Sequence, residues 1–173
     1  ICVAQNQLHG ELPPNIGITL PNLKKFVGGK NKFTGNIPAS LSNASRLQLF
    51  DVAKNDFTGT VPALGSLQSL VWLNLYSNRL GSGKAGDLNF LKFLANCTSL
   101  DWLALSNNQL GGELPVSMSN LSTTLRNLYL GTNSIHGSIP LGIGNLVNLA
   151  LVRMGNNYFS GSVPEEIGRL QKL

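Results

Sequence analysis

An asparagine recurs through this chain every 23 to 30 residues, each time inside the pattern LxxLxLxxNxLxGxhP, where h is an aliphatic residue. Two complete copies of the pattern lie between Leu100 and Pro140. A period in the twenties indicates a solenoid, in which each repeat buries its apolar face only by stacking on its neighbours. The seven asparagines at this position are Asn6, Asn31, Asn55, Asn78, Asn108, Asn133 and Asn157.

Within each repeat, which we call a rung, the residues before the asparagine alternate as on a strand with one buried face. Those five and three positions before it are predicted to enter the core, and those six, four and two positions before it to face solvent. The asparagine is also predicted to point inward, where its amide bonds backbone groups of its own turn and of the neighbouring rung. These asparagines should therefore form a structural ladder.

The segment LxGxhP that follows the asparagine resembles that of plant-type leucine-rich repeats, and this resemblance implies a second short strand there. The segment at residues 33–38, FTGNIP, is an example. Its glycine permits a bend at positive φ, and its proline ends the extended piece because it cannot donate a ladder hydrogen bond. Six of the seven rungs carry this segment.

The rung at about residues 70–99 is irregular. Asn78 and Asn108 are 30 residues apart, Ser82 replaces the bend glycine and Ala85 replaces the proline. Asp87 is predicted to be the N-cap of a short helix on the convex side. The apolar residues that follow at helical spacing are Phe90, Leu91, Leu94 and Cys97.

The repeats resemble plant-type leucine-rich repeats. The stretch from Asp87 to Leu149, with NCT, SNLS and IGNL, is similar to ectodomains of plant leucine-rich-repeat receptor kinases of the pathogen-sensing class, which includes receptors for flagellin, elongation factor Tu and rice bacterial blight. The resemblance implies an α/β leucine-rich-repeat solenoid, a curved right-handed superhelix. A parallel sheet would line its concave face, and 3-10 or short helices its convex side. We expect residues 1–173 to form a single array of about seven repeats, an uncapped piece of a longer ectodomain.

The same resemblance implies a ligand-recognition segment that senses a peptide or a pathogen pattern and recruits a leucine-rich-repeat co-receptor kinase. The parent would be a single-pass protein displayed on the extracellular side of the plasma membrane, with a cytoplasmic Ser/Thr kinase. The kinase motifs VAIK, HRD and DFG are absent from this chain. Two alternatives stay open: a secreted, cell-wall protein like the polygalacturonase inhibitors, and a developmental peptide-hormone receptor.

Other chemistry finds little support in the sequence. The net charge of +5 is scattered rather than gathered on one stretch, so nucleic-acid binding is not expected. No run of about 18 apolar residues occurs, so no direct membrane contact is expected of this chain. Cys2 and Cys97 lie about four rungs, or about 20 Å, apart, beyond the reach of a disulfide.

Catalytic and cofactor sites are not expected either. His9 and His136 share a column but lie five rungs, about 24 Å, apart, which excludes a shared metal ion. Residues 81–86, GSGKAG, match the dinucleotide motif GxGxxG, but a solenoid offers no doubly wound sheet to hold the cofactor. We interpret them as a flexible loop.

Ligand contacts are predicted on the solvent-facing strand positions. Both tryptophans of the chain fall in one column, six residues before their asparagines, on neighbouring rungs. Exposed aromatic side chains are enriched at binding hot spots, and polar neighbours can fix the register of an extended peptide. The predicted contact residues are Asp51, Trp72, Asn74, Tyr76, Trp102, Tyr129 and Arg153.

Three N-glycosylation sequons complete the candidate sites. Two of them begin twelve residues after a ladder asparagine, which places them on the convex or lateral side, away from the strands. A secreted protein would carry glycans there. The predicted acceptors are Asn43, Asn96 and Asn120.

Overall fold

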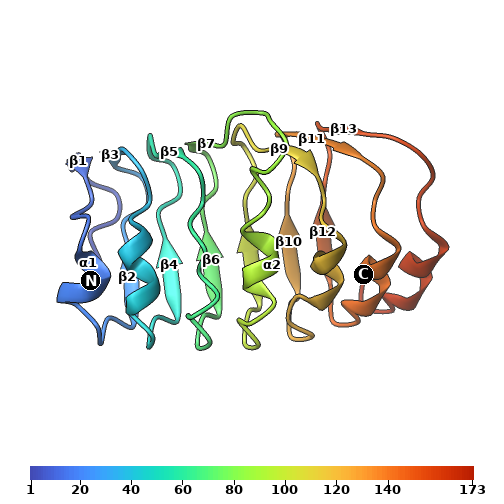
Figure 1. The fold of residues 1–173 in the computed structure, drawn as a ribbon, viewed down its shortest axis with the longest axis horizontal. Coiled ribbons are helices and arrows are strands. Elements are labelled where there is room, and N and C mark those ends of the chain that lie inside the picture. The colour runs from blue at the N-terminus through green and yellow to red at the C-terminus, as the bar shows by residue number, and fades with distance from the viewer.

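Six short parallel strands, one per rung, form the main sheet of the computed structural model, which describes residues 1–173. Neighbouring strands follow one another in chain order, and an isolated bridge between Cys2 and Val27 adds the first rung. Figure 1 shows the rungs side by side from the N-terminus to the C-terminus. The strands are β2 (Lys25–Val27), β4 (Leu49–Asp51), β6 (Trp72–Asn74), β8 (Trp102–Ala104), β10 (Asn127–Tyr129) and β12 (Leu151–Arg153).

The predicted second strands are present in all seven rungs and lie along the upper edge in Figure 1. They pair in three groups: β1 with β3, β5 with β7, and β11 with both β9 and β13. The irregular rung carries one too, although its sequence lacks the LxGxhP segment. These strands are β1 (His9–Glu11), β3 (Lys32–Thr34), β5 (Thr58–Gly59), β7 (Arg79–Leu80), β9 (Gly111–Glu113), β11 (Ser134–Gly137) and β13 (Tyr158–Phe159).

Short helices occupy the return segments, in front of the main sheet in Figure 1. All have four or five residues, and none is long and apolar enough to cross a membrane. The fold predicted from the repeat, a leucine-rich-repeat solenoid with a parallel sheet and short helices opposite it, is confirmed. The helices are α1 (Ile16–Thr19), η1 (Ala39–Asn43), α2 (Leu91–Leu94), η2 (Val116–Asn120), η3 (Leu141–Asn145) and η4 (Glu165–Arg169).

A single cluster of 38 buried residues joins the rungs into one core. The inward strand positions of the inner rungs are buried as predicted, for example Leu73 and Leu75. Gly28 occupies such a position because the rings of Phe26 and Phe33 fill the space beside it. A Cβ at Gly28 would lie 2.8 Å from the Phe26 ring.

Six of the seven asparagines, from Asn31 to Asn157, form the predicted ladder, whereas Asn6 is exposed and stands outside it. The Asn133 side-chain nitrogen donates to the carbonyl of Leu130 in its own rung (3.0 Å) and of Leu105 in the preceding rung (3.1 Å). Its Oδ1 accepts the backbone N–H of Leu110 (3.0 Å). Asn6, in the first rung, bonds only carbonyls of its own rung. The full set of three bonds recurs at Asn31, Asn55, Asn78, Asn108 and Asn157.

The residue before each ladder asparagine has a left-handed backbone, with φ between 56° and 62°. This conformation is most costly for a β-branched residue, yet Thr132 also adopts it. The hydrogen bonds of the ladder therefore impose the turn whatever side chain stands there. The seven turn residues are Gln5, Lys30, Lys54, Ser77, Asn107, Thr132 and Asn156.

The irregular rung keeps the register of the main sheet. Trp72 pairs directly with Trp102 across the long interval, and α2 confirms the predicted helix. Asp87, however, is not its N-cap: Phe90 holds that position, and no side chain bonds there. The prediction was wrong because the chain makes further turns after Asp87 before the helix begins.

Asp87 instead organises the loop that precedes it. Its buried carboxylate accepts hydrogen bonds from the backbone N–H groups of Ser82 (2.8 Å), Lys84 (3.2 Å) and Gly111 (3.0 Å), and from the Ser82 hydroxyl (3.1 Å). The GSGKAG loop that the sequence suggested to be flexible is thus anchored at its base. It rises above the upper edge of the molecule in Figure 1.

The anchored loop interrupts the row of second strands between β7 and β9. Gly83 lies against Gly111, where a Cβ would fall 2.1 Å from the Gly83 carbonyl carbon. Only glycine fits at this contact. The bend of this rung also occurs at a different position. Gly81 has the positive φ of 91°, and it lies one position closer to its ladder asparagine than the bend glycine of the other rungs does.

Replacing Asn133 with alanine is expected to lower the free energy of unfolding by about 3 kcal/mol or more, because several buried backbone groups lose their partner together. Urea denaturation followed by circular dichroism measures the change. Asn6→Ala is the matched control, with an expected loss under about 1 kcal/mol because this side chain is exposed and makes no inter-rung bond. Equal losses in the two variants would contradict the ladder.

Asp87→Ala is expected to free the loop and raise the rate of trypsin cleavage after Lys84 by about tenfold, equivalent to about 1.4 kcal/mol of local stability. Mass spectrometry of timed digests measures this rate. Asp56→Ala serves as the control, since it removes an exposed carboxylate paired only with Arg79. Unchanged cleavage in the Asp87 variant would show that other contacts hold the loop.

Candidate functional site

Three aromatic rings and a guanidinium form a continuous stack across β6, β8, β10 and β12. It lies on the solvent-facing side of the main sheet, the concave face. The rings of Trp72 and Trp102 are parallel to within 9°, with centroids 4.1 Å apart. Trp102 then contacts Tyr129 at 4.9 Å, and the Arg153 guanidinium lies 5.7 Å from the Tyr129 centroid. Because each group packs on the next, the stack is ordered without a ligand.

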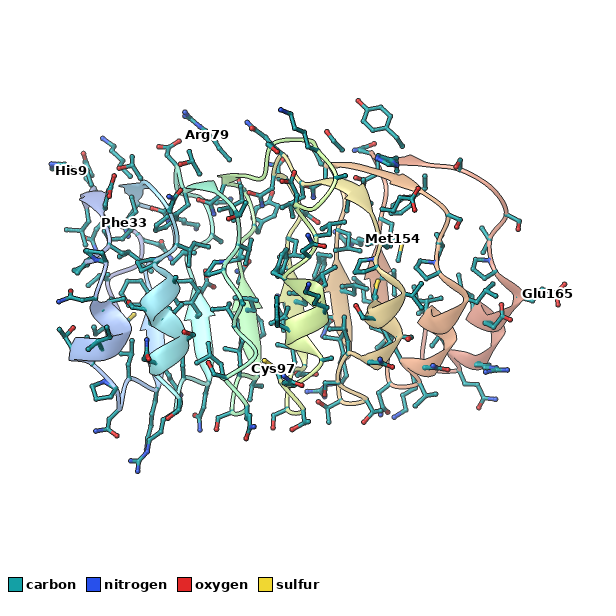
Figure 2. All side chains as sticks on the ribbon, in the orientation of Figure 1. His9, Phe33, Arg79, Cys97, Met154 and Glu165 are labelled. Carbon is teal, nitrogen blue, oxygen red and sulfur yellow. The ribbon has the colours of Figure 1, made fainter.

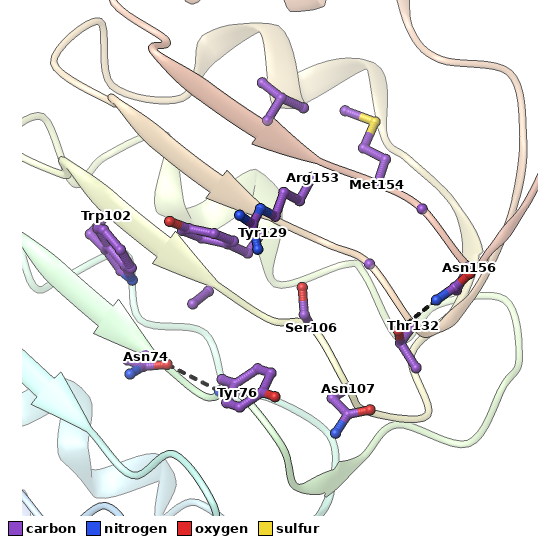
Figure 3. Close-up of a pocket in the computed structure, with 14 residues that line it drawn as sticks. Asn74, Tyr76, Trp102, Ser106, Asn107, Tyr129, Thr132, Arg153, Met154 and Asn156 are labelled. Carbon is purple, nitrogen blue, oxygen red and sulfur yellow. Dashed lines mark hydrogen bonds between the residues drawn. The ribbon is translucent and has the colours of Figure 1, made fainter.

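A trough with a volume of about 760 Å³ runs beside this stack, within the range of small-ligand sites. Trp102, Tyr129 and Arg153 form one side of it, as Figure 3 shows. The other side carries amide and hydroxyl groups, and Ser106 lies between the two. Small residues make its floor: Ala104, Ser106, Gly131 and Gly155.

A hydrogen-bonded chain of side chains closes the N-terminal end of the trough. The Asn74 side-chain nitrogen donates to Asp51 Oδ2 (2.9 Å), and Asn74 Oδ1 accepts the backbone N–H of Tyr76 (3.2 Å). The other Asp51 oxygen accepts the backbone N–H of Ala53 (3.0 Å). Three of the residues predicted from the sequence are thereby fixed relative to one another.

The structure brings five of the seven predicted contact residues into the trough and leaves two outside it. Trp72 stacks behind Trp102 and supports it without lining the trough. Asp51 borders a neighbouring, smaller depression that also touches Asn74 and Tyr76. The five that line the trough are Asn74, Tyr76, Trp102, Tyr129 and Arg153.

Comparison with known proteins agrees with this architecture. Residues 99–121 and 124–146 match the Leucine Rich Repeat family. The whole chain superposes on part of PEPR1 in the crystal structure of PEPR1 with AtPEP1, with a TM-score of 0.90 and 29% identity, covering 23% of that chain. The present chain is a plant-type leucine-rich-repeat array.

Two further relatives narrow the type of array. Over 83 residues the chain is 52% identical to the LRR receptor-like serine/threonine-protein kinase EFR of Arabidopsis thaliana, a match of 48% of this chain and 8% of that protein. The Arabidopsis receptor kinase HAESA, solved with the peptide hormone IDA and the co-receptor SERK1, matches 98% of this chain and 27% of its own, with a TM-score of 0.82 and 35% identity. The array therefore resembles the ligand-binding ectodomains of plant receptor kinases, of which it spans a minor part.

The polar side of the trough was missed from the sequence. It consists of Asn107, Thr132 and Asn156, three of the left-handed turn residues. The Asn156 amide donates to the Thr132 hydroxyl (3.4 Å), which links two of them. The repeat pattern leaves this position unspecified. A signal was available, because all seven residues at this position are polar and four of them are lysine or asparagine.

Reactive groups are absent from the trough. Cys97 is buried in the core of the array, where desolvation raises the pKa of its thiol to about 11, so the thiol is neutral and unreactive at neutral pH. Both cysteines are free. His9 points away from the core at the edge formed by the second strands in Figure 2. No cluster of three His, Cys, Asp or Glu side chains suited to a metal ion occurs in the array.

The three sequon asparagines share one region of the array. Asn43 ends η1, Asn120 ends η2 and Asn96 follows α2, so all three lie at the C-terminal end of a short helix in the return segments. Each is exposed. Glycans at these positions would project from the helical side and leave the concave face open.

Proposed function

We propose that this chain is a ligand-recognition segment of the ectodomain of a plant cell-surface receptor kinase, which binds a peptide or a pathogen-derived pattern on the concave face. The observation that carries the proposal is the trough beside the stack of Trp102, Tyr129 and Arg153. Ordered aromatic rings offer apolar contact without a further cost of ordering, and the polar side and the glycine floor suit the backbone of an extended peptide.

The solved relatives support a peptide as the ligand. PEPR1 was crystallised with AtPEP1, and HAESA with the peptide hormone IDA together with the co-receptor SERK1. By analogy, the parent of this chain would recruit a leucine-rich-repeat co-receptor kinase once its ligand is bound. It would carry a membrane-spanning segment and a cytoplasmic Ser/Thr kinase beyond this array, which would face the outside of the plasma membrane.

A developmental peptide-hormone receptor is the second candidate, favoured by the likeness of the whole chain to HAESA. The higher identity to EFR, which extends across 48% of the chain, favours the pathogen-sensing class instead. Both candidates use the same face for the same kind of ligand. Challenge of plants that express the parent receptor with microbial extracts or with endogenous peptides separates them.

Trp102→Ala combined with Tyr129→Ala is expected to weaken peptide binding at least tenfold, since two hot-spot aromatics each contribute more than about 1 kcal/mol. Biolayer interferometry with peptides selected from a random library measures the affinity. Tyr158→Ala is the control, because this ring is 70% exposed and lies on β13, outside the trough. Equal affinities for the wild type and the double variant would remove the trough from the binding site.

Protein made in a plant or insect secretory host is expected to carry N-glycans at Asn43, Asn96 and Asn120, because each sequon is exposed on the helical side. Glycopeptide mass spectrometry before and after enzymatic deglycosylation gives the occupancy. Asn145, which ends η3 but has no Ser or Thr two residues later, is the internal control and should remain unmodified. Three unmodified sequons would count against an extracellular location.

A further inference from the structure

One column of the concave face has a single bulky member. The residues two positions before the ladder asparagines are glycine, alanine or serine in six of the seven rungs, and tyrosine in the fourth. Tyr76 is 38% exposed and stands where its neighbours in the column offer only backbone or a small side chain. The column reads Ala4, Gly29, Ala53, Tyr76, Ser106, Gly131 and Gly155.

Tyr76 borders two hollows at once. It lines the trough on its C-terminal side and a smaller depression of about 340 Å³ on its N-terminal side. Its backbone is held by Asn74, whose amide reaches Asp51 on the preceding strand. The Lys54 ammonium lies 5.9 Å from the Tyr76 ring centroid. These contacts tie the ring to two rungs, so it forms a fixed ridge between the hollows.

The N-terminal depression differs from the trough in the number and kind of charged side chains that line it. Lys30 and Lys54 line it over a floor made by Gly29 and Ala53. Neither lysine belongs to either of the two ion pairs of the structure, which join Arg79 to Asp56 and Arg126 to Asp101. Neither ammonium group is therefore neutralised by a carboxylate of the array, although that of Lys54 also faces the Tyr76 ring.

Asp51 is the only acidic residue that lines the depression. Its two carboxylate oxygens already accept hydrogen bonds from Ala53 and Asn74. The lining groups together carry two positive charges and one negative charge. The net charge of the lining is thus +1 in both hollows, but the depression offers two ammonium groups to an anionic group, whereas the trough has the single guanidinium of Arg153.

We infer that Tyr76 divides the ligand-binding face into two subsites, and that the subsite between Lys30 and Lys54 binds a carboxylate of the same peptide whose apolar residues occupy the trough. This inference rests on the proposed function. A small residue of the peptide would pass over the Tyr76 ridge, because a large side chain would meet the ring. The carboxylate belongs either to an Asp or Glu side chain or to the C-terminus of the peptide.

The geometry sets the spacing along the peptide. Lys54 is in the third rung and Asn107, opposite the aromatic stack, is in the fifth. Two rungs correspond to about 9.6 Å, which an extended chain covers in about three residues. The carboxylate should therefore lie about three residues from the apolar residue that enters the trough.

The test is selection of a random 12-residue peptide library with a free C-terminus against the protein and its variants. The wild type is expected to enrich peptides that place a carboxylate about three residues from an aromatic or aliphatic residue. Lys30→Glu with Lys54→Glu should reduce the enrichment of the acidic group at least tenfold while the apolar preference persists. The control, Lys84→Glu with Lys92→Glu, makes the same charge change on the GSGKAG loop and on α2, and should leave both preferences intact.

Tyr76→Ala should remove the preference for a small residue between the two groups, whereas Tyr76→Phe should retain it. Circular dichroism melting curves establish that each variant is folded. For single selected peptides, amidation of the C-terminus and Asp→Asn or Glu→Gln changes show which carboxylate is bound.

The failures of the two proposals differ. An acidic preference that is missing from the wild type, or that survives the Lys30/Lys54 reversal, would overturn the second subsite and leave the trough in place. If the wild type enriches apolar residues no more than the Trp102→Ala/Tyr129→Ala variant does, the proposed function is overturned. The second subsite then falls with it.

Discussion

The whole structure depends on the hydrogen bonds of the inward asparagine. A rung must turn sharply after its strand, and the turn leaves carbonyl and N–H groups pointing into a core without water. Asn55 shows how these groups are satisfied: it donates to the carbonyls of Gly28 and Val52 and accepts the N–H of Phe33. Two of the three partners belong to the preceding rung. Each asparagine after Asn6 therefore completes its own turn and joins it to the rung before it.

This coupling fixes the spacing of everything on the concave face. The same turn at every rung sets the strand register, so residues at equal distances from their asparagines become direct neighbours. Trp72 and Trp102 pair in the sheet although 30 residues separate them, and their rings stack as a consequence. The binding face is thus ordered by the ladder, while its chemistry is left to positions that the ladder does not specify.

Sequence reasoning succeeded where the repeat carries the information. The repeat pattern predicted the first strands and the outward column of aromatic residues, and its resemblance to plant-type leucine-rich repeats implied the parallel sheet and the second strands. It failed at Asp87, whose partner Gly111 lies 24 residues away in a contact that occurs once in the molecule. A pattern derived from repetition contains nothing about a contact that is not repeated. The polar side of the trough was missed for another reason: the pattern LxxLxLxxNxLxGxhP leaves the position of Asn107 and Thr132 unspecified, so the repeat does not mark their side chains.

The irregular rung shows how such an array changes one surface without disturbing another. Asn108 makes the usual bonds to Leu75 and Leu105 and accepts the N–H of Leu80, so the ladder crosses the insertion intact. The extra residues leave the rung after β7, break the row of second strands there and return through α2. The concave face consequently stays continuous from Lys30 to Arg153, as an extended ligand requires. The loop held by Asp87 adds a separate surface at the edge of the array, which can vary without altering the trough.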